Sequence, residues 1–135
     1  MQTYKLGILV EGVNDAKAVF AALPPEEFPH VMVAWNNGTP DGSKLRHLVN
    51  KVKEQCPVVY ALTDPDAAGD ILAEKLLHYG IPRIYVDKEE CMQVRLSGPF
   101  RLVKRGVEYA SPEYLREVIC KVTGLEAADN AESLE

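Results

Sequence analysis

The sequence predicts an α/β fold in which a four-stranded parallel sheet carries helices on both faces. Short apolar runs suited to buried strands alternate with longer segments whose apolar residues recur at helical spacing. The runs are apolar on both faces, as expected for parallel strands covered by helices on each side. Each run ends near Gly, Pro, Asn or Asp, which favour turns. The predicted strands are residues 6–10, 31–35, 58–62 and 83–86.

Three helices are expected between these strands. Asn14 suits the start of the first helix, and the Pro24-Pro25 pair stops it. Ser43 can cap the second helix, whose apolar stripe continues to residue 52. The third helix follows residues 63–70 and ends at Gly80, where a left-handed cap is natural. Right-handed crossovers would then place the helices on both faces of the sheet.

The rest of the chain is less regular. Residues 92–96 alternate like an exposed strand, residues 97–99 favour a turn, and residues 100–105 suit a partner strand. A Ser-Pro-Glu sequence at 111–113 predicts the start of a last helix. We therefore expect a core over residues 1–88, a C-terminal hairpin-and-helix extension over 89–124 packed on the core, and a disordered acidic tail over 125–135.

Composition narrows the class of protein without defining its partner. The net charge is -5, but the expected tail supplies four acidic residues, so the body is nearly neutral. The three cysteines are far apart and form no C-x-x-C pair, which argues against a disulfide framework and fits a reducing cytoplasm. The N-terminus lacks the apolar core of a signal peptide, and no run is long enough to cross a membrane. We expect a soluble cytoplasmic protein with no membrane partner.

The most informative feature is a group of carboxylates at predicted strand ends. Glu11 follows the first strand, and Asp64 and Asp66 follow the third. In an open parallel sheet, sites form beyond the carboxyl ends of the strands, so these three side chains converge if the two strands are neighbours. Oxygen ligands without His or Cys are typical of Mg²⁺, with Mn²⁺ also possible. The spacing therefore predicts a phosphate-directed metal site.

Two alternatives remain open at this stage. Asp66 is well placed to cap the following helix, and such a turn-and-cap role explains one aspartate but not two. Gly12 and Gly69 leave room for a phosphate or a metal-bound water, although Gly69 also suits close packing of the helix on the strand.

These motifs resemble the Toprim domain shared by topoisomerases, bacterial primases and several nucleases. Both halves are present in the expected order: Glu-Gly closes the first strand, and Asp-x-Asp-x-x-Gly closes the third. Within that family the sequence is most similar to the small ribonucleases that mature 5S ribosomal RNA. The similar segments are residues 8–15, 37–38, 62–66 and 106–113.

The resemblance implies a role for each matching residue. Glu11 would act as general acid or base or help to hold a metal, Asp64 and Asp66 would bind Mg²⁺, and Asp15 and Asp70 would be supporting acids. The maturases usually have basic residues where Val13 and Ala73 stand and His where Tyr109 stands. They also have a C-terminal RNA-binding domain that has no counterpart here. The catalytic acids are thus retained, whereas groups that grip the substrate are fewer.

Three function classes are compatible with these residues. The first is a Mg²⁺-dependent nuclease acting on nucleic acid, RNA more than DNA, perhaps alongside a ribosomal or other RNA-binding protein. The second is a non-catalytic metal- or nucleotide-binding module within a larger assembly. The third, a phospho-acceptor receiver domain, needs paired acids at the first strand, where Glu11 is alone. Nucleic-acid contact would use basic residues of the second helix and the hairpin, namely Lys44, Arg46, Lys51, Arg95, Arg101, Lys104 and Arg105.

Overall fold

A computed structural model describes residues 4–36 and 42–127. Its main sheet has three parallel strands in the order β2-β1-β3. These are β1 (Leu6–Val10), β2 (Val31–Trp35) and β3 (Val58–Leu62). β1 lies in the centre, in register with β2 through Val10↔Trp35 and with β3 through Val10↔Leu62. The carboxyl ends of all three strands therefore meet at one edge of the sheet.

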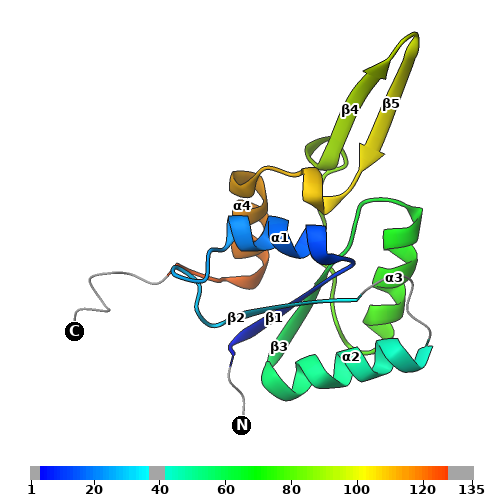
Figure 1. The fold of residues 1–135 in the computed structure, drawn as a ribbon. Helices are drawn as coiled ribbons and strands as arrows, with labels where there is room; N and C mark the ends of the chain where they lie inside the picture. The colour runs from blue at the N-terminus through cyan, green and yellow to red at the C-terminus, as the bar shows by residue number, and fades with distance from the viewer. Residues whose placement is uncertain (1–3, 37–41, 128–135) are drawn as a thin grey trace.

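Helices cover both faces of this sheet (Figure 1). One face packs against α1 (Val13–Ala22) and α4 (Pro112–Thr123), the other against α2 (Gly42–Gln55) and α3 (Ala67–His78). Alternate residues of β1 serve the two cores: Ile8 lies in the α1/α4 cluster and Leu9 in the α2/α3 cluster. This period of two, with apolar side chains on each face, explains why β1 is apolar throughout.

The predicted fourth strand at 83–86 is wrong, because this segment makes only a single parallel bridge, between Ala61 and Arg83. The Ala61 amide donates to the Pro82 carbonyl, and the Ile84 amide donates to the Ala61 carbonyl. Pro82 has no amide hydrogen with which to extend the ladder toward the start of β3. At its other end β3 stops at Leu62, and Tyr85 is 75% exposed. The parallel sheet therefore has three strands rather than four.

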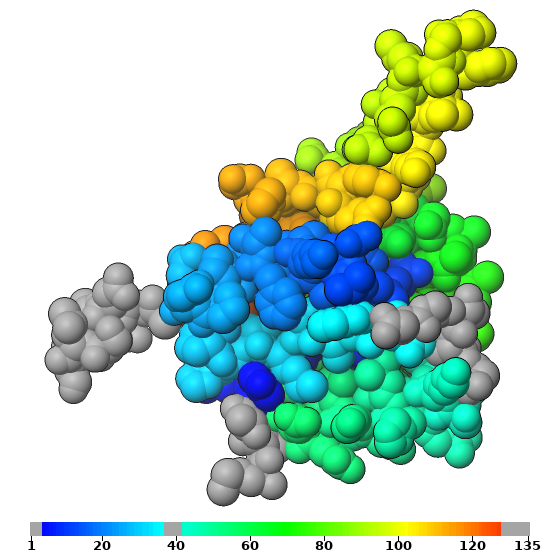
Figure 2. Space-filling view, in the orientation of Figure 1, coloured from blue at the N-terminus to red at the C-terminus, as the bar shows by residue number. Residues whose placement is uncertain are grey.

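The second sheet is an antiparallel hairpin of β4 (Met92–Ser97) and β5 (Phe100–Arg105). The turn between them places Gly98 at φ 58°, the positive angle that a two-residue type II′ turn requires at its first central residue. The 3-10 helices η1 (Glu89–Cys91) and η2 (Val107–Tyr109) flank the hairpin. Both strands project from the body of the molecule (Figures 1 and 2).

Helix α4 begins with Ser111 as its cap, whose side chain accepts a hydrogen bond from the Tyr114 amide, and it ends at Gly124 with φ 74°. Its buried residues Leu115 and Ile119 join the core on the α1 side. Leu125 and Ala127 pack against the same core, whereas residues 128–135 of the predicted tail lie outside the described residues. Within the described part of the chain, no helix has the length and apolar character needed to span a membrane.

Candidate active site

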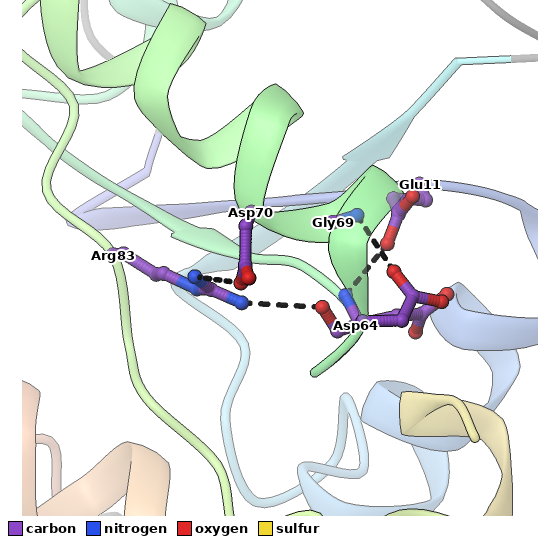
Figure 3. A network of polar contacts seen from close by, with 6 residues as sticks. Glu11, Asp64, Gly69, Asp70 and Arg83 are labelled. Atoms are coloured by element: carbon purple, nitrogen blue, oxygen red, sulfur yellow. Dashed lines mark hydrogen bonds and ion pairs between the residues drawn. The ribbon is translucent and has the colours of Figure 1, made fainter.

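Two of the three predicted carboxylates meet at the edge where the strands end. β1 and β3 are neighbours, so Glu11 and Asp64 follow paired positions of the sheet. The Asp64 amide donates a hydrogen bond to Glu11 Oε2 across 2.6 Å (Figure 3). A carboxylate that accepts from a backbone amide is held in one orientation, independently of solvent. The pairing of the two strands therefore fixes Glu11 against Asp64.

The Asp64-Pro65-Asp66 segment is a tight turn rather than the extended backbone that we expected. The Asp66 amide donates to the Asp64 carbonyl across 2.9 Å, which closes the chain around Pro65. Asp66 Oδ1 accepts from the Gly69 amide across 2.7 Å and caps α3. The capping interpretation of Asp66 is thus correct. One of its carboxylate oxygens is committed to the helix, and the other oxygen remains a possible ligand.

Gly69 is required for packing. A Cβ at this position would lie 1.9 Å from the Asp64 carbonyl oxygen, a backbone atom that cannot move aside cheaply. At Gly12, in contrast, a Cβ would meet nothing within 4 Å. The close-packing interpretation therefore accounts for Gly69, while Gly12 leaves open space beside Glu11 without any steric need for glycine.

The turn also receives support from the C-terminal part of the chain. The Val107 amide, in η2, donates to Asp64 Oδ1 across 2.8 Å. Asp15, in the first turns of α1, is only 7% exposed and lies near both Asp64 and Glu108. Segments from both halves of the sequence thus enclose the Asp64 carboxylate.

These contacts produce an unusual electrostatic state. Burial, reinforced by the neighbouring Asp64 charge, raises the pKa of Glu11 to about 7, against the lowering effect of its hydrogen bond from the Asp64 backbone. Burial likewise raises the pKa of Asp64, and burial with the Asp64 and Glu108 charges raises the pKa of Asp15 to about 6. Three carboxyl groups therefore share a region in which their own repulsion and partial burial oppose ionisation.

Arg83 is a residue of this region that sequence analysis missed. Its Nη1 lies 2.7 Å from Asp70 Oδ1, and its Nη2 donates to the Asp64 carbonyl across 3.1 Å. Figure 3 shows Arg83 and Asp70 on one side of the Asp64 turn and Glu11 on the other. Asp70, which the resemblance made a supporting acid, therefore pairs with Arg83. The only sequence signal for Arg83 was its place at the start of the segment beside β3.

The donor set suits a hard divalent cation. Its side chains are all carboxylates, and their raised pKa values indicate repulsion that Mg²⁺ or Mn²⁺ would relieve. Among residues 4–36 and 42–127, however, no three His, Cys, Asp or Glu side chains are grouped closely enough to hold a metal unaided. Glu11, Asp64 and the second oxygen of Asp66 would therefore need water or a substrate phosphate to complete the coordination shell.

A pocket of about 490 Å³ opens directly beside these carboxylates. Glu11, Gly12 and Asp15 form its polar end together with Asn36 and Lys75. Its remaining walls are apolar and come from β1, α2 and α3. An apolar pocket with a few convergent polar groups is typical of ligand sites. The acids thus border a space large enough for part of a substrate.

The predicted basic residues fall into two separate groups. Lys44, Arg46 and Lys51 lie on the exposed side of α2, whereas the other four lie on the hairpin. Figure 1 shows α2 and the hairpin at opposite ends of the molecule. A short nucleic-acid segment could therefore contact one group or the other, but not both.

Comparison with known proteins supports the fold assignment. No protein-family model matches the sequence, and no curated protein matches it. Among solved structures, a small TOPRIM domain protein from Bacillus stearothermophilus superposes with a TM-score of 0.68 over 100% of both chains, at 23% sequence identity. The chain therefore has the fold of a small Toprim domain protein.

Proposed function

We propose that this protein is a Toprim-type enzyme that carries out Mg²⁺-dependent phosphodiester chemistry on nucleic acid. The observation that carries the proposal is the placement of Glu11 against Asp64 at the carboxyl ends of two adjacent parallel strands. Sites of open α/β sheets form at this edge. The substrate would be structured RNA rather than DNA, cut internally in the manner of a 5S ribosomal RNA maturase, in the cytoplasm and with or without an RNA-binding protein partner.

The chain's own groups divide the chemistry among them. Asp64 and Asp66, with Glu11, would hold the cation, which stabilises charge developing on the phosphate and activates the attacking water. Glu11 can also accept or return a proton, because burial and Asp64 place its pKa at about 7. The Val107 amide and the strand pairing keep Asp64 and Glu11 in place. The adjacent pocket would receive the part of the substrate next to the phosphate.

Glu11→Gln tests the enzyme directly. Glutamine keeps the shape and can still accept the Asp64 amide hydrogen bond, but it cannot transfer a proton. Labelled structured RNA and DNA are incubated with each protein in Mg²⁺ or EDTA. We expect wild type to cut RNA in Mg²⁺ only, and Glu11→Gln to cut at least about 100-fold more slowly while binding RNA alike. If neither protein cuts any substrate, the enzyme proposal is wrong.

The alternative is a non-catalytic metal- or nucleotide-binding module within a nucleic-acid-processing assembly. It is favoured by the use of Asp66 as a helix cap and by the absence, within the described residues, of a complete metal-binding group. Melting curves in millimolar Mg²⁺ or Mn²⁺ separate the metal from the chemistry. Both functions predict a higher melting temperature with metal, and loss of that response in Asp64→Asn, because a ligand bound only by the folded state stabilises it.

A further inference from the structure

The register of the β4–β5 hairpin defines two side-chain faces. Directly opposite residues of an antiparallel pair share a face, and successive residues alternate between faces. Ser97 is opposite Phe100, Arg95 is opposite Leu102, and Gln93 is opposite Lys104. We call this set the Phe100 face. The other set, the Leu96 face, consists of Met92, Val94, Leu96, Arg101, Val103 and Arg105.

The Phe100 face is open to solvent. The Phe100 side chain is 67% exposed and Leu102 is 51% exposed, and Figure 2 shows the hairpin standing clear of the body. A folded domain rarely leaves large apolar side chains exposed on a projecting element without a partner for them. This arrangement points to a binding surface.

Charge identifies the chemistry of that partner. The hairpin has four basic residues and no acidic residue between Met92 and Arg105. On the Phe100 face, Arg95 is a diagonal neighbour of Phe100, and Lys104 is on the same strand beyond Leu102. Diagonal neighbours are roughly 7–8 Å apart, within reach of long side chains. The face thus combines an exposed ring with cations on one side of it, which favours an anionic and aromatic ligand.

Unpaired nucleotides have both properties. Single-stranded nucleic acid binds by stacking its bases on aromatic side chains while cations follow the phosphates. Bases inside an A-form duplex are not accessible to such a ring, because the major groove is deep and narrow and the bases are stacked. We propose that the Phe100 face binds an unpaired stretch of nucleic acid, with a base stacked on Phe100 and phosphates beside Arg95 and Lys104. This inference rests on the proposed nucleic-acid substrate, but it requires neither metal nor cleavage.

Binding in EDTA tests the inference independently of catalysis. Fluorescence anisotropy measures the dissociation constants of labelled 12-nucleotide oligo(U) and of an RNA duplex of the same length. We expect wild type to prefer oligo(U). Phe100→Ala should weaken oligo(U) binding about tenfold, the scale of one lost stacking contact, and Phe100→Trp should restore it. Leu96→Ala is the matched control, because Leu96 is 81% exposed and lies on the other face.

Three results would overturn the inference: no oligo(U) binding by wild type, equal binding by Phe100→Ala, or an equal loss in Leu96→Ala. Circular dichroism confirms that each variant is folded. A self-association of wild type that Phe100→Ala abolishes in sedimentation, without a change in oligo(U) affinity, would assign the face to a second copy of the chain instead.

A spectroscopic signal separates stacking from general adhesion. Trp35 is the only tryptophan, so Phe100→Trp combined with Trp35→Phe places a single reporter on the hairpin. Oligo(U) should quench its fluorescence, whereas an abasic oligomer with the same phosphates should not. Equal quenching by both oligomers would contradict base stacking. Because EDTA is present throughout, a lack of nuclease activity would leave this outcome unaffected.

Discussion

The acidic edge of the main sheet and the basic hairpin place their functional groups by different means. At the acidic edge, Glu11, Asp64 and Asp66 each accept a hydrogen bond from a backbone amide that belongs to another segment or to the next helix turn. On the hairpin, side-chain positions follow from the strand register alone, and the side chains of both strands remain largely exposed. The first arrangement is rigid and depends on packing, whereas the second is adaptable.

This difference separates stability from binding. Changes at the acidic edge should alter the free energy of unfolding as well as function, because they remove or crowd buried contacts. Changes on the hairpin should alter binding with little effect on stability, because few contacts hold those side chains. The following experiments, from the largest expected effect to the smallest, test that division.

Gly69→Ala should destabilise the protein by at least about 3 kcal/mol, the upper range for overpacking, because its Cβ would approach the Asp64 carbonyl to 1.9 Å. Gly12→Ala, at an open position with extended backbone, should change stability by less than about 0.5 kcal/mol. Urea unfolding measures both. Similar effects in the two variants would show that the helix does not approach the turn so closely.

Without metal, wild type should lose stability as the pH rises from about 4 to 7. The folded-state pKa values of Asp15 and Glu11 are raised to about 6 and 7, so the folded protein binds protons that the unfolded chain has already released in this window. The stabilisation is complete below the unfolded pKa values and lost as the pH passes through the folded ones. Glu11→Gln should flatten the upper part of this loss, on the order of 1 kcal/mol. Melting curves across the pH range measure it, and a rise in stability with pH would contradict the prediction.

Arg83→Ala should cost about 1 kcal/mol, the scale of a partly exposed ion pair with one further hydrogen bond. It should also weaken the response to Mg²⁺, because Arg83 holds the carbonyl of Asp64. The matched control is Arg116→Ala, since Arg116 pairs with Glu27 and lies 4.9 Å from the Phe28 ring centre, outside this region. A weakened response in both variants would indicate a general loss of stability rather than a local role for Arg83.

Arg101→Ala combined with Arg105→Ala should leave stability within about 0.5 kcal/mol of wild type. If both residues contact phosphates, the slope of log affinity against log salt should become shallower by between one and two. Arg46→Ala combined with Lys51→Ala makes the same change of charge on α2, at the other end of the molecule. The pair that alters the slope identifies the contact surface, and an unaltered slope in the hairpin variant would exclude Arg101 and Arg105 from it.

Local sequence patterns were sufficient for several parts of this molecule. The three apolar runs that became β1, β2 and β3 were recognisable because strands buried on both faces need apolar residues throughout. The cap at Asp66 was recognisable because its oxygen bonds an amide only three residues away. Glu11 and Asp64 were recognisable as neighbours because parallel strands bring their carboxyl ends to one edge.

Only the tertiary structure decided the contacts between distant segments. The segment at 83–86 has a strand-like composition, but its pairing depends on Pro82 and on where β3 ends. The Val107 amide carries no side-chain signal, since any residue can donate from its backbone, and Arg83 reaches Asp64 only after the chain has folded. Sequence by itself thus determined which residues form the sheet and where its acids collect. The directions in which those acids point depended on hydrogen bonds between residues far apart in the chain.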